Sequence, residues 1–255
     1  VVGKWDGLIV YVRERMASYN RKRLVEHKVP FVVPGNQMYL PMLGIDLREH
    51  FRMLNESKEV LRPATQVVLI QSLLLGAGDL GPTALSLELG YSIMAMSRAL
   101  DELKAVELVH TTIRGRERHV RLAGSRREVW EKAQPYLRNP VVKRYGVNLL
   151  PGAKLPGPRA GLGALAHYSM LNELENVEVA LARGDWKRVL ETGNIEPTGV
   201  INEPGTTIVE IWSYSPILFS DGDFVDRLSL YLSLRDTQDE RVQAALNQMI
   251  KEELW

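Results

Sequence analysis

Residues 62–122 read RPATQVVLIQSLLLGAGDLGPTALSLELGYSIMAMSRALDELKAVELVHTTIRGRERHVRL, and the other predictions follow from the pattern of this segment. Its first part is apolar and of helical length, and Pro63 stands where proline is favoured, in the first turn of a helix. Gly76, Gly78 and Gly81 end this helix, because glycine tolerates the backbone angles of a turn. The stretch therefore opens with a buried helix.

Two more helices follow. The second begins at Pro82 and breaks at Gly90, and Ser92 can cap the third, which we expect over residues 93–104. Apolar residues at helical spacing predict its buried face: Met96, Leu100 and Leu103. The opposite face carries Met94, Ala95, Ser97, Arg98, Asp101 and Glu102. Small and basic residues near the start of a helix suit the major groove of DNA.

A β-hairpin completes the stretch. Residues 108–113 and 119–122 favour strands, and the tip between them is Arg114-Gly115-Arg116-Glu117-Arg118. Three arginines around one glycine can reach phosphates or enter a minor groove. We therefore expect a helix-turn-helix followed by a wing.

This layout resembles the winged-helix transcription regulators of the MarR type. The resemblance rests on TALSLELGYS (residues 83–92), on MSRALDEL (residues 96–103) and on Leu108-Val109 before the hairpin, and it is limited to about residues 62–124. It implies that the helix with Ser97 and Arg98 contacts bases, that Arg114, Arg116 and Arg118 touch the DNA backbone or minor groove, and that the protein binds pseudo-palindromes as a homodimer.

Composition limits the other classes of function. The 255 residues contain no cysteine, which excludes disulfides, thiolate metal sites and cysteine nucleophiles and fits a cytoplasmic protein. We see no apolar run that would span a bilayer and no signal-peptide pattern. A chain that opens at Val1 without methionine is what a fragment or a processed protein would show.

The net charge of +1 hides a polarised distribution. Residues 62–145 hold 13 Lys/Arg against 8 Asp/Glu, whereas residues 160–255 hold 16 Asp/Glu against 7 Lys/Arg. A basic central part supplies the phosphate attraction that DNA binding needs. For the acidic part alone, ordinary solvation of a surface is the favoured interpretation.

The flanking segments indicate an α/β fold overall, with the winged helix-turn-helix between an N-terminal and a C-terminal α/β segment. In the first we expect strands at 8–12, 31–33 and 38–40, a helix at 19–28, and a connector over 45–60. The basic cluster Arg21-Lys22-Arg23 is interpreted as a solvated face, with phosphate contact as the alternative.

After the hairpin, Ser125 caps a further helix, and the Pro/Gly-rich residues 151–158 suggest a domain boundary. Beyond it we expect helices at 162–174 and 185–192, the latter capped by Asp185, and strands at 177–181 and 207–212. The alternation in residues 228–234 favours a strand over a buried helix, and residues 242–250 form an amphipathic helix. The predicted domains are 1–60, 61–150 and 151–255.

No enzymatic constellation is convincing. Asp221, Asp223 and Asp226 lack the later glutamate of an EF-hand and are interpreted as a solvated turn. The five histidines lack metal-ligand spacing, so we expect no metal and no cofactor. Glu210 could belong to a nuclease carboxylate cluster, but no lysine stands two residues after it.

The sequence thus predicts a cytoplasmic, prokaryotic, homodimeric regulator of transcription that binds specific double-stranded DNA and is not an enzyme. The candidate DNA-binding residues are Ser92, Met94, Ala95, Ser97, Arg98, Arg114, Arg116, Arg118, Arg126 and Arg127. One alternative is an interaction or scaffold protein, such as a replication, partition or antitoxin-type factor that meets a protein partner through its C-terminal domain. A metal-dependent DNA-processing enzyme is the other alternative.

Overall fold

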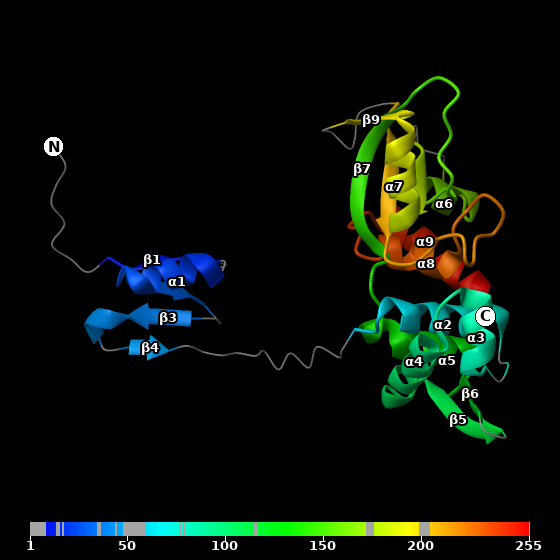
Figure 1. The fold of residues 1–255 in the computed structure, drawn as a ribbon, viewed down its shortest axis with the longest axis horizontal. Coiled ribbons are helices and arrows are strands. Elements are labelled where there is room, and N and C mark those ends of the chain that lie inside the picture. Colours follow the sequence, from blue (N-terminus) through cyan, green and yellow to red (C-terminus); the bar gives the residue numbers. More distant parts are fainter. Residues whose placement is uncertain are drawn as a thin grey trace. The chain divides into compact units, whose positions relative to one another are not determined.

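A computed structural model describes residues 9–13, 16, 18–34, 37–43, 45–47, 60–76, 78, 80–114, 117–171, 176–198 and 205–254 (Figure 1). Over these ranges the fold is mixed α/β, with nine α-helices and three small sheets. The chain forms two compact units, Val1–Glu59 and Val60–Trp255. Among the described helices, none combines the length and the apolar composition needed to cross a bilayer.

The first unit is a small sheet with one helix. Its elements are β1 (Tyr11–Val12), α1 (Ser18–Glu26), β2 (Phe31–Val33), β3 (Gln37–Leu40), a 3₁₀ turn (Pro41–Leu43) and β4 (Ile45–Leu47). The strands lie in sequence order, with β1 parallel to β2 and the later pairs antiparallel. Buried Phe31 and Val33 alternate with half-buried Val32, as expected for a strand covered on one face.

These elements confirm the predicted strand–helix–strand order with two adjustments. The first predicted strand is shorter, because Ile9 and Val10 precede β1, while Leu8 lies outside the described residues. The predicted connector begins with β4, which continues the sheet, and its residues 48–59 lie outside the described part of the chain.

The second unit opens with three helices and a hairpin. These are α2 (Pro63–Leu75), α3 (Pro82–Leu89), α4 (Ile93–Ala105), β5 (Val109–Arg114) and β6 (Glu117–Leu122). Gly90 ends α3 in the left-handed region at φ 72°, where glycine avoids the clash of a side chain. Leu80, between α2 and α3, exchanges two backbone hydrogen bonds of 2.9 Å with Val120 and so extends the hairpin by one bridge.

The rest of the unit is a second sheet with helices on both faces. Its elements are α5 (Arg126–Ala133), a 3₁₀ turn (Gln134–Tyr136), β7 (Val141–Leu149), α6 (Gly161–His167), β8 (Glu178–Ala182), α7 (Arg183–Thr192), β9 (Ile195–Thr198), β10 (Thr207–Trp212), α8 (Arg227–Leu234) and α9 (Glu240–Leu254). The strand order is β8-β10-β7-β9, and only β8 and β10 are parallel. Trp186 and Val189 of α7 pack with Val209 on one face, whereas Trp212 on the other joins the core of the helices.

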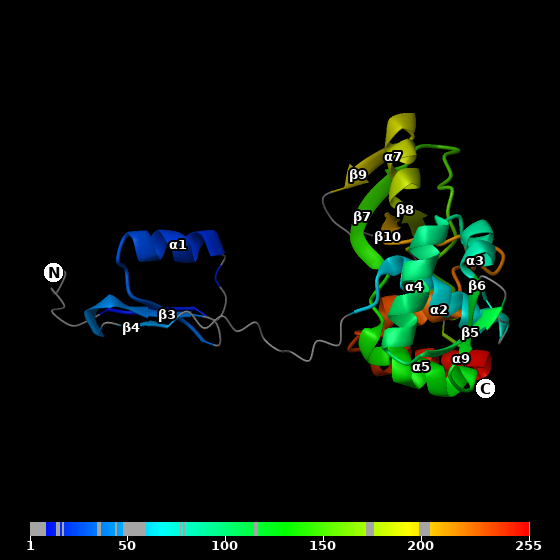
Figure 2. The same ribbon diagram turned by 60° about the horizontal axis from the view of Figure 1, so that its bottom comes forward.

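One hydrophobic core joins the three-helix segment to the C-terminal helices. Gln66 of α2 donates to the carbonyl of Arg138 at 3.0 Å and accepts from the Arg138 amide at 2.9 Å. The rings of Trp130 and Tyr231 meet edge-on at 5.5 Å, and α9 lies beside α5 (Figure 2). β7 ends at Leu149 but belongs to the C-terminal sheet, so the structure shows no break in packing at the expected boundary after residue 150.

Three sequence predictions need correction. Residues 228–234 form helix α8, not a strand: Asp226 caps its first turn by accepting from the Ser229 amide at 2.8 Å. Leu228, Leu230 and Leu232 are buried together with two serines, so the alternation in sequence does not mark two different faces. Asp185 does not cap α7, which begins at Arg183, and instead pairs with Arg188. The helix predicted over 162–174 ends at His167.

Candidate nucleic-acid interface

Helix α4 packs one face against the core and exposes the opposite face to solvent. The Ser92 hydroxyl caps it by accepting from the Ala95 amide at 3.2 Å. The predicted inward residues Met96, Leu100 and Leu103 are fully buried. Near its start, Ile93 and Met94 are 54% and 64% exposed, which leaves large apolar side chains in water at the end that would enter a groove.

Glu102 fastens α4 to the start of α2. Its carboxylate accepts from the backbone amide of Arg62 at 3.1 Å, from the Arg62 guanidinium at 3.0 Å and from the Thr65 hydroxyl. Burial alone would raise the pKa of Glu102, but these hydrogen bonds outweigh it and lower the pKa below its ordinary value. Glu102 was expected on the open face, so the structure corrects that placement.

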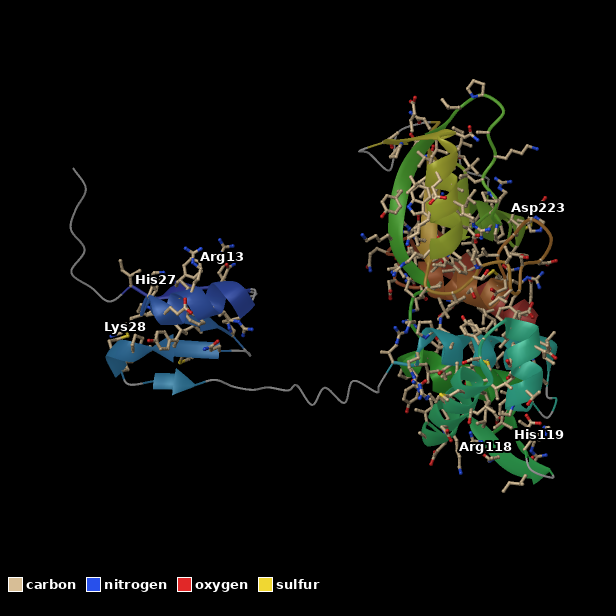
Figure 3. The ribbon with its side chains drawn as sticks, viewed as in Figure 1. Arg13, His27, Lys28, Arg118, His119 and Asp223 are labelled. Carbon is tan, nitrogen blue, oxygen red and sulfur yellow. The ribbon has the colours of Figure 1, made fainter. Side chains whose placement is uncertain are left out.

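The hairpin is fastened to both neighbouring helices. Arg118 donates to the Asp101 carboxylate at 2.5 Å and to the Ser97 carbonyl at 3.0 Å on α4 (Figure 3). Glu117 accepts from the Thr83 amide at the start of α3 at 2.9 Å, and this hydrogen bond lowers the pKa of Glu117. Arg118 and Glu117 thus hold the hairpin against α4 and against the start of α3.

Three basic side chains on this part of the molecule have no partner among the described residues. Arg98 on α4, Lys104 at the end of α4 and Arg121 on β6 are exposed and make no side-chain hydrogen bond or ion pair with any described residue. In contrast, Asp101 is paired with Arg118, and Glu102 is paired with Arg62. The acidic groups are therefore compensated within the protein, while the basic groups stay available to an anion.

The structure brings some of the ten candidate residues together and separates others. Ser92, Met94, Ala95, Ser97 and Arg98 lie on α4, and Arg118 reaches them from the hairpin. Ser92 and Ser97 already use their hydroxyls, the first in capping and the second as an acceptor for Arg118 at 3.4 Å.

Two of the remaining arginines, Arg126 and Arg127, make their contacts on α5 and α9 instead. Arg126 on α5 donates to the carbonyl and the carboxylate of Glu253 at 2.8 and 3.2 Å, so its side chain is committed to α9. Arg127 pairs with Glu131 one turn along α5 at 2.9 Å. Arg114 closes strand β5, but its side chain lies outside the described residues, as does the whole of Arg116.

Lys104 and Arg121 were missing from the sequence-based set. Arg121 could have been found from period-two spacing, since it alternates with buried Val120 and Leu122 along a predicted strand. The anchoring role of Glu117 has no local signal, because its partner Thr83 is 34 residues away.

The described carboxylates of the C-terminal part serve in ion pairs, in a helix cap and in a turn. Glu210 is completely buried; one oxygen accepts from Arg144 at 2.7 Å and the other from the indole of Trp212 at 3.0 Å. Asp226 is used in capping α8, and Asp221 and Phe224 close a turn through their backbones (Asp223 is labelled in Figure 3). Among the described residues no group of three histidines or carboxylates converges as metal ligands would.

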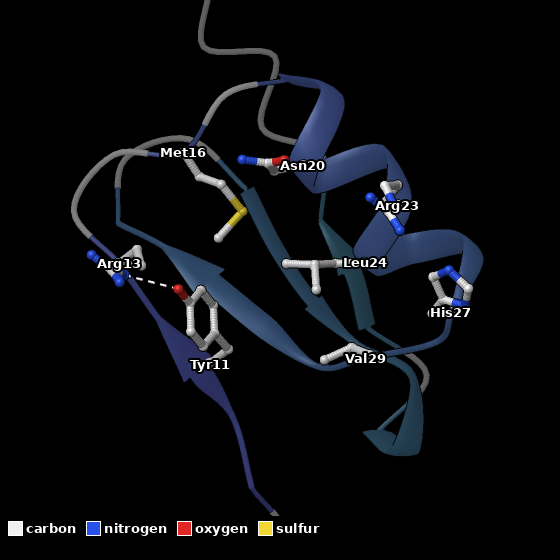
Figure 4. Close-up of a pocket in the computed structure, with 8 residues that line it drawn as sticks. All are labelled: Tyr11, Arg13, Met16, Asn20, Arg23, Leu24, His27 and Val29. Atoms are coloured by element: carbon white, nitrogen blue, oxygen red, sulfur yellow. Dashed lines mark hydrogen bonds between the residues drawn. The ribbon is translucent and has the colours of Figure 1, made fainter.

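The first unit has a basic pocket of about 620 Å³ between β1 and α1 (Figure 4). Arg13, Arg23 and His27 line it without an acidic residue among the described lining residues, and Arg13 donates to the Tyr11 hydroxyl at 2.9 Å. From the basic cluster 21–23, only Arg23 lines this pocket; the side chain of Lys22 lies outside the described residues. An anion suits this chemistry, and phosphate contact therefore remains an open prediction for this unit.

Comparisons of the chain with protein-family models, with curated proteins and with solved structures give no match.

Proposed function

We propose that α2, α3, α4 and the β5–β6 hairpin form a winged helix-turn-helix, and that the protein is a sequence-specific regulator of transcription which binds double-stranded DNA. One observation carries the proposal: the acidic side chains Asp101 and Glu102 of α4 are neutralised within the protein, whereas Arg98 on its exposed face has no partner among the described residues. A helix with this charge arrangement can enter a phosphate-lined groove without repulsion.

The exposed side chains of α4 suit base contacts. Arg98 offers the planar donor pair that matches the two acceptors of guanine in the major groove. Ile93 and Met94 expose apolar surface at the start of the helix, where a thymine methyl group would cover it. Arg98, Ile93 and Met94 therefore carry the proposed sequence preference.

The hairpin and the end of α4 suit backbone contacts. Arg121 and Lys104 are exposed and form no ion pair with a described residue, so each can replace a counterion on a phosphate. Arg118 acts as a positioning residue, because its guanidinium holds the hairpin and compensates Asp101. The Arg114-Gly115-Arg116 tip remains a predicted phosphate or minor-groove contact.

Fluorescence-anisotropy titrations over a range of salt test the proposal on a pool of random duplexes. Arg121→Ala is expected to weaken binding to all duplexes and to reduce the slope of log K against log salt by about one. Arg183→Ala is the matched control, since Arg183 is an exposed arginine on α7, a helix that lies away from the hairpin (Figure 1). Equal effects of both substitutions would argue against the interface.

A second candidate function is assembly through the exposed apolar residues of the same segment. Leu75 at the end of α2 and Leu87 on α3 are 73% and 82% exposed, so each presents a large apolar side chain to water. They favour a homodimer or a protein partner for a DNA-tethered scaffold. Sedimentation of wild type and Leu87→Asp tests this, and an unchanged monomer in both samples would count against it.

A further inference from the structure

A second pocket of about 500 Å³ lies where the three-helix segment meets the C-terminal helices. Its walls come from α2, α3, the residue after α6, the loop before α8, the start of α8 and the end of α9. All of these belong to one compact unit and share its core. The pocket therefore lies within one compact unit, where several helices and one loop meet.

Gln71 gives this pocket an unused hydrogen-bond acceptor. The residue lines the pocket and is only 3% exposed, and its amide nitrogen donates to the Glu88 carboxylate. The amide oxygen of Gln71 is buried and has no partner among the described residues. A buried acceptor without a donor is costly, so a ligand that brings an N–H group to this oxygen would relieve that cost.

The charges around the pocket are mainly negative. Four acidic residues line it, and Arg227 is the one described lining residue with a basic side chain. The acidic residues are Glu88, Asp221, Asp226 and Glu253. Arg227 is already used, since it pairs with Glu253 at 2.6 Å and lies over the Tyr168 ring at 4.6 Å. Glu88 and Asp221 have no basic partner among the described residues.

The titration of Tyr168 reflects the same negative surroundings. Burial, and then the neighbouring charge of Asp221, raise the pKa of Tyr168 to about 12, against the opposing effect of Arg227. Tyr168 therefore stays protonated, and its hydroxyl donates a hydrogen bond of 3.1 Å to the Val225 carbonyl. The Tyr168 side chain therefore adds no negative charge to the pocket, and Arg227 already lies over its ring.

Apolar side chains form the remainder of the wall. Leu74, Leu89, Leu218 and Phe219 contribute to it from α2, α3 and the loop. A small ion would leave these apolar side chains exposed to water, whereas a ligand with an apolar body would cover them.

We propose that this pocket binds a small organic cation, an amine or amidine with an apolar body. The cationic N–H groups donate to the Gln71 oxygen and to the free oxygen of Glu88, and the apolar body lies against Leu74, Leu89 and Phe219. A metal ion suits the site less well, because half of its wall is apolar and one acceptor is an amide. The proposal concerns ligand binding by the isolated protein and does not depend on DNA binding.

Calorimetric titrations of the full chain test it with two pairs of probes: benzamidine against benzamide, and phenethylamine against 2-phenylethanol. Within each pair the apolar body is similar and the charge differs. We expect the cation to bind at least tenfold more tightly than its neutral partner in at least one pair. Cations that bind no better than their neutral partners in both pairs would overturn the proposal.

Variants locate the binding. Glu88→Gln removes one charge at an exposed position and is expected to weaken cation binding at least fivefold; Gln71→Met removes the acceptor at similar volume and should act in the same direction. Glu131→Gln on α5 is the matched control and should bind as wild type. Thermal unfolding without ligand shows that each variant is folded. Wild-type affinity in Glu88→Gln would place the cation elsewhere and refute the assignment.

Discussion

At the scale of single residues, the proposed DNA-binding surface depends on a few acidic and basic side chains that pair with one another, while neighbouring basic side chains have no partner among the described residues. Arg118 is the clearest example, because it joins the hairpin to α4 through Asp101 and Ser97. The pair is partly exposed, at 29% and 58%, so its direct contribution to stability is small, about 0.5 kcal/mol. Its effect should instead appear in the position of the hairpin.

Arg118→Ala is therefore expected to change local order more than global stability. Amide hydrogen exchange in β5 and β6 should become faster, while exchange in α2 stays the same, and DNA affinity should fall by more than the loss of Arg121 causes. Arg121→Ala is the control, because its side chain makes no contact that holds the hairpin. Unchanged exchange in Arg118→Ala would contradict the positioning role.

Glu102→Gln tests the link between α4 and α2. A neutral amide has one oxygen for the three donors that the carboxylate now serves, so we expect a loss of about 1–2 kcal/mol in the free energy of unfolding at pH 7. Because the pKa of Glu102 is lowered in the folded protein, the contribution is present above its ordinary pKa of 4.5 and is lost as pH falls through the lower folded value.

Denaturant unfolding of both proteins between pH 3.5 and 8 gives the measurement. The difference between wild type and Glu102→Gln should be constant above about pH 5.5 and should shrink toward acid pH. Glu131→Gln, at an exposed pair on α5, serves as the control. A difference that grows toward acid pH would have the wrong sign for this mechanism.

At the scale of the elements, much of the secondary structure followed from residues that begin and end helices. Pro63, Pro82, Ser92 and Ser125 stand at helix starts, and Gly90 at a helix end, as predicted. Each of these signals acts within one or two turns of chain. Local chemistry is therefore enough to place them.

Other features depend on contacts that no local pattern contains. α8 resembles a strand in sequence because LSLYLSL alternates, yet core residues surround it on several sides and Asp226 starts a helix. The same limit applies to the candidate site: the exposed Arg98 was predictable from helical spacing, whereas the pairing of Arg118 with Asp101 and of Glu102 with Arg62 depends on tertiary packing.

Gly90 provides a prediction at this scale. Its φ of 72° lies in the left-handed region and nothing stands within 4 Å of an added Cβ, so Gly90→Ala should cost about 1 kcal/mol through the backbone alone. Gly184 in α7 has equally open space and no such angle, so Gly184→Ala should raise stability by about 0.5–1 kcal/mol. Thermal or denaturant unfolding of both variants gives the comparison, and equal signs would contradict it.

At the scale of the whole molecule, the two compact units divide at Glu59 and Val60. Residues 60–255 contain a complete core that joins α2–α5 to α6, α8 and α9. We expect this fragment to unfold cooperatively and to bind DNA with wild-type sequence preference. A shorter fragment, residues 60–150, separates β7 from β10 and removes α9 from α5, so it should not fold cooperatively. Circular dichroism during thermal unfolding distinguishes the two, and a cooperative 60–150 fragment would show that the predicted boundary at 150 is real.

The proposed role of α4 is to read DNA sequence. The most direct measurement is selection of duplexes from a random pool by wild type, Arg98→Ala and the control Arg183→Ala, followed by sequencing of the retained DNA. We expect wild type and Arg183→Ala to enrich the same motif. Arg98→Ala should lose base preference at defined positions of that motif, above all at positions where wild type prefers guanine. An identical motif in all three, or no enrichment by the wild-type protein, would contradict it.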